Sequence, residues 1–301
     1  MNASAIVPAH NEEQNIIGLL RRLTDEAPTS GVDDIVVVAS GCTDATLSLA
    51  RSFAETHPSV RVIEQARREG KASAINAGLH EVRHDVVVLI SGDVMPERGA
   101  VALLVQRLGD ETVGVVGGRP VPLNDPSTFV GFAAQTMWRM HHWINERSAE
   151  AKCGEMIAFR RALHGQPIVT AIPAASAVDE VSIQAIAREA GLRSVYEPQA
   201  IVRNWGPNSV RQWMRQRRRI NAGHLLAARE GYHPSTSSSA LVIRALLHDR
   251  PGRSRPHWLC AVAALEVAAK IAARRDVSRG EVHTVWRVAE STKRPIEQES
   301  T

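Results

Sequence analysis

The stretch VVVLISGD, residues 86–93, decides the fold. Its first five residues are all apolar and mostly β-branched, which is typical of a strand buried on both faces of a parallel sheet. Ser91, Gly92 and Asp93 follow this strand directly. Because open α/β sheets bind their ligands at the carboxyl ends of their strands, Asp93 is a candidate site residue. A simple turn former or helix cap is the alternative interpretation of Asp93.

Further apolar runs and helical patterns extend this strand on both sides. The other predicted strands are residues 3–7, 35–38 and 60–63, and the helical patterns between the strands cover residues 16–23, 47–54 and 71–79. Asn11 and Gln14 resemble a capping box before the first helix. The alternation predicts β-α-β units, and therefore an α/β, Rossmann-like, doubly wound and mostly parallel sheet flanked by helices.

Length, composition and charge favour a soluble globular protein. The 301 residues, of which 44% are hydrophobic and 23% are charged, suffice for a closed core and differ from a disordered or fibrous chain. Lysine plus arginine (36) exceeds aspartate plus glutamate (32) by four, which is far from a polycation built for nucleic acid. We therefore predict no nucleic-acid partner.

Cysteine usage and the first residues indicate a reducing compartment. Cys42, Cys153 and Cys260 lie far apart, with no C-x-x-C pair, which argues against a disulfide framework and against a cysteine zinc site. Residues 1–10 lack a basic region followed by a long apolar run, so no secretory signal is predicted. We expect a cytoplasmic protein.

The second half of the chain is less regular. Aromatic and methionine residues recur in residues 129–143, a pattern that is usually core and sometimes a platform for a sugar ring. A helix is predicted over residues 179–190, and the polar residues 235–239 predict a flexible connector to a helical, arginine-rich tail. Apolar residues 258–273 contain two charged side chains, which predicts a packed or surface-lying helix and not a membrane crossing.

Five short motifs, in this order, resemble those of a family 2 glycosyltransferase of the GT-A fold. They are Pro8-Ala9-His10-Asn11-Glu12 for P-x-x-N-E, Gly41-Cys42-Thr43-Asp44 for G-S-T-D, Gly70-Lys71-Ala72 with Asn76-Ala77-Gly78 for G-K-x-x-A-x-N-x-G, Ser91-Gly92-Asp93 for D-x-D, and Gln216-Arg217-Arg218-Arg219 for Q-x-x-R. Each motif is common alone, but together over residues 3–223 they are specific. The resemblance implies a glycosyltransferase domain over residues 1–233, divided into a nucleotide-sugar-binding half (1–122) and an acceptor-binding half (123–233). Residues 234–301 would form a helical C-terminal extension.

The resemblance implies transfer of a sugar from a nucleoside-diphosphate sugar to an acceptor hydroxyl, with inversion. Cleavage of the bond to the diphosphate places negative charge on the leaving group, so Mg²⁺ or Mn²⁺ and protein cations are needed there. Asp93 is the implied metal ligand. The implied nucleotide-sugar-binding residues are Pro8, Ala9, His10, Glu12, Ser40, Gly70, Lys71, Ser91, Gly92, Gln216 and Arg219.

An acidic pair at the start of a helix supplies the catalytic base in this family, because an alcohol is a poor nucleophile until its proton is taken. The pair here is Asp179-Glu180. Counting back from Gly191 places Glu180 at the family's base position, and Asp179 stays open as the alternative. Acids in a first helical turn also complement the helix dipole without any catalytic role.

Two departures from the family pattern leave alternatives open. Ala39-Ser40 stands where the family has an aspartate pair, and Ser91 replaces the first aspartate of D-x-D. A single aspartate can hold Mg²⁺ with diphosphate and water, unless a further ligand comes from the second half of the chain. The missing carboxylates motivate a catalytically silent domain that binds nucleotide or glycan. The shared metal chemistry motivates a sugar-phosphate nucleotidyltransferase.

The donor and the acceptor stay open at this stage. The acceptor would be lipid-linked, a glycan or a small molecule, and a lipid-linked acceptor would bring peripheral contact with the inner face of the membrane. Five arginines and Trp213 in residues 211–219 suit anionic lipid or nucleic acid, or are simply solvated, and the diphosphate motif among them argues against nucleic acid. His141 and His142 point to different sides of a helix and are expected to be structural or acceptor-facing.

Overall fold

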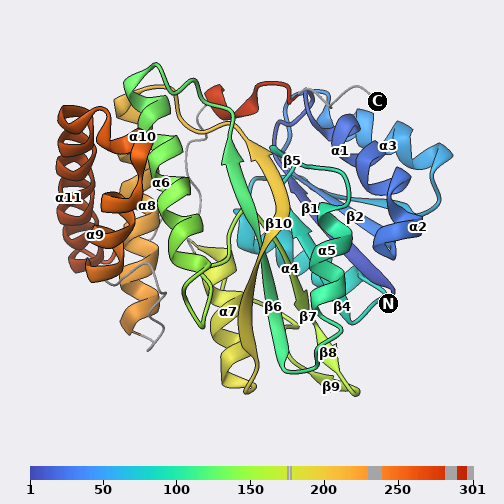
Figure 1. Ribbon diagram of the computed structural model, residues 1–301. Helices are drawn as coiled ribbons and strands as arrows, with labels where there is room; N and C mark the ends of the chain where they lie inside the picture. Colours follow the sequence, from blue (N-terminus) through green and yellow to red (C-terminus); the bar gives the residue numbers. More distant parts are fainter. Residues whose placement is uncertain (175, 177, 230–238, 282–289, 297–301) are drawn as a thin grey trace.

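The computed structural model describes residues 1–174, 176, 178–229, 239–281 and 290–296 (Figure 1). An eight-stranded sheet forms its centre, in the order β3-β2-β1-β4-β7-β6-β10-β5. The strands are β1 (Ala3–Ala9), β2 (Val32–Ser40), β3 (Val60–Gln65), β4 (Val86–Ile90), β5 (Val94–Pro96), β6 (Val113–Pro122), β7 (Met156–Arg160) and β10 (Arg193–Asn204). The four strands predicted from apolar runs are confirmed.

Strand direction divides the sheet into two parts. Strands β1 to β4 are mutually parallel, and β6 is parallel to β10. Strand β7 runs antiparallel between β4 and β6, and β5 is antiparallel to β10. The predicted α/β class with a mostly parallel sheet is confirmed, and a two-stranded ribbon of β8 (Ala162–Leu163) and β9 (Gln166–Pro167) is added to it.

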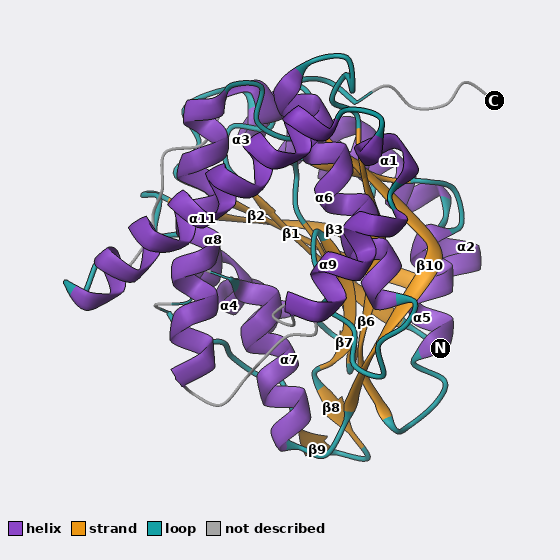
Figure 2. Cartoon of the chain, turned by 60° about the vertical axis from the view of Figure 1, so that its left-hand side comes forward, coloured by secondary structure: helices purple, strands orange, loops and turns teal. Residues whose placement is uncertain are grey.

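Helices lie on both faces of the sheet (Figure 2). Those along the first two thirds of the chain are α1 (Ile16–Asp25), α2 (Ala27–Ser30), α3 (Thr46–Thr56), α4 (Lys71–Glu81), α5 (Ala100–Arg107), α6 (Phe129–Asn145) and α7 (Asp179–Glu189). Residues from α1, α3 and α5 form one apolar core with the sheet, and residues from α4 and α7 form a second core on the other face. Strands β1, β2 and β4 therefore bury both of their faces, as their composition predicts, whereas β3 at the edge of the sheet is only partly buried.

The start of α1 differs from the prediction. Asn11 has a left-handed φ of 56°, and its side-chain amide bonds the backbone N–H and the hydroxyl of Thr43 instead of capping a helix. The helix begins only at Ile16. The capping-box prediction at Asn11 is wrong because that side chain joins two loops at the carboxyl ends of β1 and β2.

The remaining helices form a third layer beside the sheet. They are α8 (Val210–Arg229), α9 (Ser239–His248), α10 (Arg250–Arg253), α11 (Pro256–Ser278) and the short 3₁₀ helix η2 (Glu290–Lys293). Arg217 on α8 makes two hydrogen bonds of 2.8 and 2.9 Å to Glu266 on α11, and Arg218 pairs with Asp276. These two arginines therefore join α8 to α11, and the interpretation that they are simply solvated is wrong for Arg217, which is buried.

Helix α11 is, among the described helices, the one long and apolar enough to cross a membrane by length and composition. Most of its apolar window is not buried inside the protein. Its packing on α8 agrees with the predicted packed or surface-lying helix. The division of the chain at residues 233/234 stays a prediction, and residues 235–238 of the expected connector lie outside the described residues.

Candidate active site

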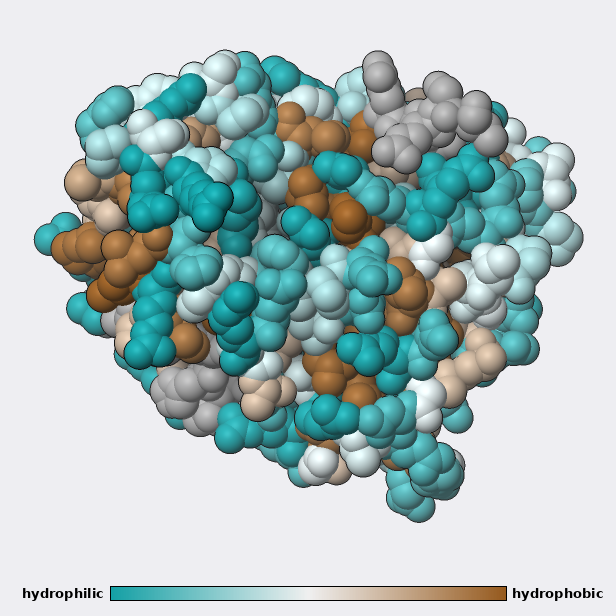
Figure 3. Space-filling view, viewed as in Figure 1, coloured by the Kyte–Doolittle hydropathy of each residue, from teal (hydrophilic) through white to brown (hydrophobic). Residues whose placement is uncertain are grey.

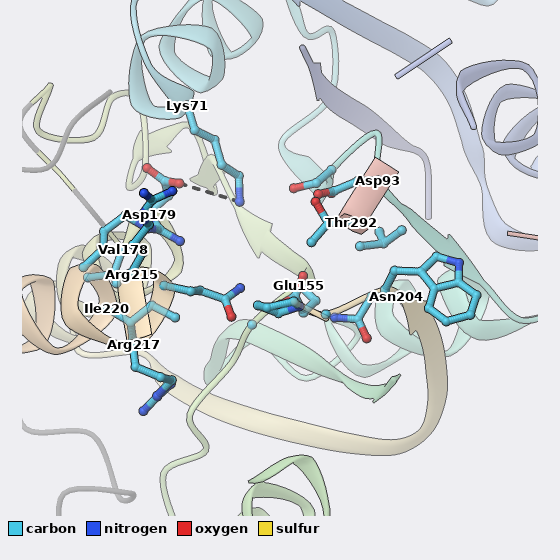
Figure 4. Close-up of a pocket in the computed structure, with 18 of the residues that line it drawn as sticks. Lys71, Asp93, Glu155, Val178, Asp179, Asn204, Arg215, Arg217, Ile220 and Thr292 are labelled. Carbon is cyan, nitrogen blue, oxygen red and sulfur yellow. Dashed lines mark ion pairs between the residues drawn. The ribbon is translucent and has the colours of Figure 1, made fainter. Parts of the chain in front are cut away.

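A cavity of about 940 Å³ opens at the carboxyl ends of β1, β2 and β4 (Figure 4). Its walls come from four sources: the ends of these strands, the first turns of α4 and α7, the inner faces of α6 and α8, and η2. Every residue predicted for the site lines this cavity except Gly92. The fold thus brings together side chains that lie more than 200 positions apart in the sequence, from Pro8 to Arg219.

The ends of β1 and β2 form one wall. Nδ1 of His10 lies 2.7 Å from the backbone oxygen of Ser40, which fixes the imidazole across the two strands. The backbone N–H of Glu12 donates to Thr46 Oγ1 at the start of α3. Gly92 lies behind this wall, and a Cβ there would approach Glu12 Cγ to 2.9 Å. Gly92 therefore acts by allowing the close packing of Glu12 and not by lining the cavity.

Lys71 joins the donor half of the chain to the acidic pair. Gly70 has a φ of 100°, which favours glycine, and it places Lys71 as the first residue of α4. Lys71 Nζ lies 3.0 Å from Glu180 Oε1 and 3.6 Å from Asp179 Oδ2 at the start of α7. Burial alone would lower the pKa of Lys71, but the two carboxylates raise it, so Lys71 stays a cation.

The two acids differ in their proton affinity. Burial raises the pKa of Asp179, with the charge of Glu180 adding to it and Lys71 opposing it. Burial also acts to raise the pKa of Glu180, but the charge and hydrogen bond of Lys71, a backbone hydrogen bond and the charge of Arg219 together outweigh it, and the pKa of Glu180 is lowered. Oδ1 of Asp179 has no hydrogen-bond partner among the described residues. Both acids are held beside one cation, and Glu180 is the one that is firmly ionised.

Asp93 and Glu155 form a second carboxylate pair. Burial raises the pKa of Asp93, opposed by the charges of Lys71 and Arg219. Burial and then the charge of Asp93 raise the pKa of Glu155 to about 7. Glu155 has a left-handed φ of 62° immediately before β7, a position that sequence reasoning missed.

This pair fits a divalent cation. Two partly buried carboxyls whose pKa values are both raised by burial, and of which Glu155 also feels the charge of Asp93, would gain from a shared positive charge. Mg²⁺ commonly uses one or two carboxylates plus substrate phosphates. Within the described residues no group of three or more histidine, cysteine, aspartate or glutamate side chains could hold a metal by itself. The remaining ligands would come from the diphosphate and water.

Helix α8 brings the last predicted residues, Gln216 and Arg219, to the cavity. Burial lowers the pKa of Arg219, and the charges of Asp179, Glu180 and Glu155 oppose this change. Arg219 therefore lies among the carboxylates of both acidic pairs. Together with Lys71 it gives the lining of the cavity two cations for the predicted diphosphate.

Several lining residues were not predicted as part of the site. Thr292 and Lys293 on η2 reach the cavity from the end of the chain, where Lys293 Nζ pairs with Glu12 and donates to the backbone oxygen of His10 at 3.0 Å. Lys152, Trp213 and His224 line it from the other side. The arginine-rich stretch around Trp213 was the one sequence signal among these residues, whereas Lys152, His224, Thr292 and Lys293 are single polar side chains without a motif.

Comparison with known proteins agrees with this geometry. The family model described as "Glycosyl transferase family 2" matches residues 4–162, which is more than half of the chain. The chain belongs to glycosyl transferase family 2.

Relatives in this family include the glycosyltransferase AglE of Haloferax volcanii, 25% identical over 115 residues, which are 38% of each chain. The dolichol-phosphate mannosyltransferase of Pyrococcus furiosus is 29% identical over 121 residues, 40% of this chain and 34% of that protein. The matched stretches thus span about a third of the length of these curated relatives.

Solved structures of glycosyltransferases match over more of the chain. The mannosyltransferase PcManGT of Pyrobaculum calidifontis, in complex with GDP-Man and Mn²⁺, is 27% identical with a TM-score of 0.60, and the match covers 93% of this chain and 79% of that one. Glucosyl-3-phosphoglycerate synthase of Mycobacterium tuberculosis, in complex with Mn²⁺, UDP and glucosyl-3-phosphoglycerate, is 19% identical with a TM-score of 0.53, covering 75% and 79%. The second likeness shows the fold alone, and both confirm the predicted GT-A architecture.

Proposed function

We propose that this protein transfers a sugar from a nucleoside-diphosphate sugar to an acceptor hydroxyl, with inversion at the anomeric carbon. The observation that carries the proposal is the meeting of Lys71, Glu180 and Asp93 in one cavity at the carboxyl ends of the strands. A cation, an ionised base candidate and a metal-ligand candidate are the three groups that this reaction needs.

The donor would lie between the ends of β1 and β2 and the first turn of α4. Pro8, Ala9 and His10 would contact the base and ribose. Lys71 and Arg219 would contact the diphosphate, with the backbone N–H groups at the start of α4 as further donors. Asp93 and Glu155 would hold Mg²⁺ or Mn²⁺, which supplies Lewis-acid stabilisation of the charge on the departing diphosphate.

Glu180 is the proposed base. Its pKa is lowered, so it is ready to accept a proton at neutral pH, and its side chain is more exposed to the cavity (18%) than that of Asp179 (5%). When Lys71 turns to the diphosphate, Glu180 loses its partner and its affinity for a proton rises. Asp179, whose oxygen Oδ1 lacks a partner, is the alternative base.

Release of nucleoside diphosphate tests the proposal. The full chain with Mn²⁺ is given UDP-, GDP- and dTDP-sugars, and wild type is expected to release diphosphate from at least one. The double variant Asp179→Asn/Glu180→Gln should not do so, whereas Glu189→Gln, on the exposed end of α7, should match wild type.

Two outcomes would favour the alternatives. Nucleotide that raises the melting temperature without any release would indicate a silent binding domain. Pyrophosphate released from a nucleoside triphosphate and a sugar phosphate would indicate a nucleotidyltransferase.

We further propose peripheral contact with an anionic membrane through α9 and α11. Ile243, Leu247, Val267 and Ile271 are exposed apolar residues of these helices, and Figure 3 shows the brown patch at its left edge, where Figure 1 places α9 and α11. Exposed arginines lie on the same layer, at Arg244, Arg250, Arg253 and Arg274. Apolar side chains flanked by cations are typical of surface-binding helices.

Co-sedimentation with vesicles tests this contact. Binding to phosphatidylglycerol vesicles and not to phosphatidylcholine vesicles is expected, and Ile243→Ser/Leu247→Ser should weaken it. Val210→Ser, at another exposed apolar position, is the matched control. Equal binding by the double variant and the control would contradict the proposal.

A further inference from the structure

One end of the cavity lies away from the predicted donor. In Figure 4, Arg217 is on the opposite side of the cavity from Asp93 and Thr292. Lys152, His141 and His224 are the electrostatic neighbours of Arg217, while Asp93 interacts with Lys71 and Arg219. We call the set His141, Lys152, Trp213 and His224 the far chamber; its members come from α6, the segment between α6 and β7, and α8.

Three polar nitrogens of the far chamber have no hydrogen-bond partner in the described part of the chain. Nε1 of Trp213 and Nδ1 of both His141 and His224 are buried without a hydrogen-bond partner. His141 is 6% exposed and Trp213 is 2% exposed, and both line the cavity. An unsatisfied buried donor costs about 1–3 kcal/mol, so a cluster of such groups calls for an explanation.

Lys152 adds a positive charge to these nitrogens. Arg217 is neutralised by Glu266, but no described carboxylate lies within ion-pair distance of Lys152 Nζ. Burial and then the charge of Arg217 lower the pKa of Lys152 to about 8, so it is still largely a cation at neutral pH. A buried cation without a partner is unfavourable, and an anionic ligand would relieve it.

We propose that the far chamber binds an anionic group, a phosphate or a carboxylate, of the acceptor. This inference rests on the proposed function, and it adds the chemical class of the acceptor. Under the proposed function the donor diphosphate would meet Lys71 and Arg219, so a second anion is the ligand that the unpaired ammonium of Lys152 fits. Glu180 is among the charges that act on Lys152, so the proposed base lies within electrostatic range of the far chamber.

The far chamber also has apolar lining. Met137, Trp138 and Ile220 line the cavity beside the nitrogens, so the group that carries the anion would pack on apolar surface. Such an anion could belong to a soluble phosphorylated molecule or to a lipid phosphate. Both present the same chemistry to Lys152, and the experiment separates them.

Calorimetric titration of the full chain, saturated with Mn²⁺ and the nucleoside diphosphate that binds best, tests the proposal. The probes are inorganic phosphate, 3-phosphoglycerate and farnesyl phosphate in detergent, with glycerol as the neutral probe. Wild type is expected to bind an anionic probe and not glycerol. Lys152→Met is expected to weaken that binding at least about tenfold, the scale of one lost charged hydrogen bond.

Three variants separate a binding role from a structural one. Because burial lowers the pKa of Lys152, its ammonium opposes folding at neutral pH, and Lys152→Met should keep or raise the melting temperature. Trp213→Phe keeps an aromatic ring in place and removes one N–H donor. It should lower the affinity for the anionic probe severalfold. Arg21→Met removes an equal charge at an exposed position on α1, outside the cavity, and should match wild type.

The outcomes distinguish this inference from the proposed function. Absence of nucleotide binding would overturn the proposed function. If nucleotide binds while no anionic probe binds, or while Lys152→Met binds the probe as wild type does, the far-chamber inference is overturned alone. Preference for 3-phosphoglycerate would support a soluble acceptor, and preference for farnesyl phosphate would support a lipid phosphate.

Discussion

At the Lys71 end of the cavity, cations and carboxylates already face one another, whereas at the Lys152 end an ammonium and several nitrogens face no acceptor in the described chain. Both ends are built from residues far apart in the sequence. The difference shows that charge pairing alone does not mark a binding site. The cation Lys71 of the donor end is balanced by Glu180 before any ligand arrives, whereas the ammonium of Lys152 in the far chamber is balanced only when an anion binds.

The largest expected effect tests the base at the balanced end. Glu180→Gln keeps the shape of the side chain but cannot take a proton, so kcat for transfer should fall by about 10³-fold. Asp179→Asn should cost about tenfold, because it changes only the charge around Lys71. Steady-state kinetics with the identified donor measure both effects. The reverse order of the two effects would make Asp179 the base and would contradict the assignment of Glu180.

The second prediction concerns the Asp93–Glu155 pair. Asp93→Asn should lower kcat/KM by about 10²-fold and weaken Mn²⁺ binding in the presence of nucleoside diphosphate, because a neutral amide is a poorer ligand. Glu155→Gln should cause a smaller loss of kcat/KM and a smaller loss of Mn²⁺ affinity. Electron paramagnetic resonance of Mn²⁺ measures binding independently of turnover. Unchanged Mn²⁺ affinity in Asp93→Asn would remove this residue from the metal site.

The sequence was sufficient for the sheet and for the balanced end. Continuous apolar runs such as residues 86–90 have one stable environment, a strand covered on both faces, and short motifs such as Gly70-Lys71 lie at strand or helix ends where the fold must bring them together. The capping-box prediction failed at Asn11 because an asparagine amide can either cap a helix or link two loops. Only the folded chain shows which of these hydrogen bonds forms.

The far chamber and η2 could not be predicted in this way. His141, Trp213 and His224 lie on helices whose apolar pattern is also that of a core, so their unpartnered nitrogens are a property of packing and not of spacing. Lys293 contacts Glu12 across 281 positions, and no local pattern encodes such a contact. Glu155 likewise lies in no recognisable motif, so its place beside Asp93 could not be predicted from the sequence.

The third prediction tests the contact that η2 adds to the balanced end. Lys293→Met leaves the buried carboxylate of Glu12 without its cation beside the nucleotide wall, so repulsion should weaken nucleoside-diphosphate binding by about tenfold. Glu12→Gln in the same chain removes the repulsion and should restore most of the affinity. Titration calorimetry of the two single variants and the double variant gives the coupling. Additive losses would contradict a role through Glu12.

The last and smallest prediction tests the unbalanced end by pH. The pKa of Lys152, about 8, lies below its usual value of 10.5 because of burial, so its charge is present at lower pH and is lost as the pH rises through about 8. Sulfate is the suitable probe because, unlike phosphate, it keeps one charge state near neutral pH. Its affinity should fall by about threefold to fivefold between about pH 8 and pH 9.5, since the bound anion itself raises the pKa of Lys152.

The other groups around Lys152 keep their charge over this range, which assigns the effect to one residue. Burial lowers the pKa of His141 and His224 well below 6.5, so both stay neutral. The other groups that act on Lys152 are Arg217, Glu180, Glu266 and Glu155. The pKa of Glu180 is lowered, that of Glu266 is about 2 and that of Glu155 is about 7, so these three carboxylates are ionised above pH 8. Lys152→Arg should bind sulfate with little pH dependence, because a guanidinium stays charged. An equal fall in wild type and Lys152→Arg would place the titrating group elsewhere, and the ammonium of Lys152 would then not be what the anion binds.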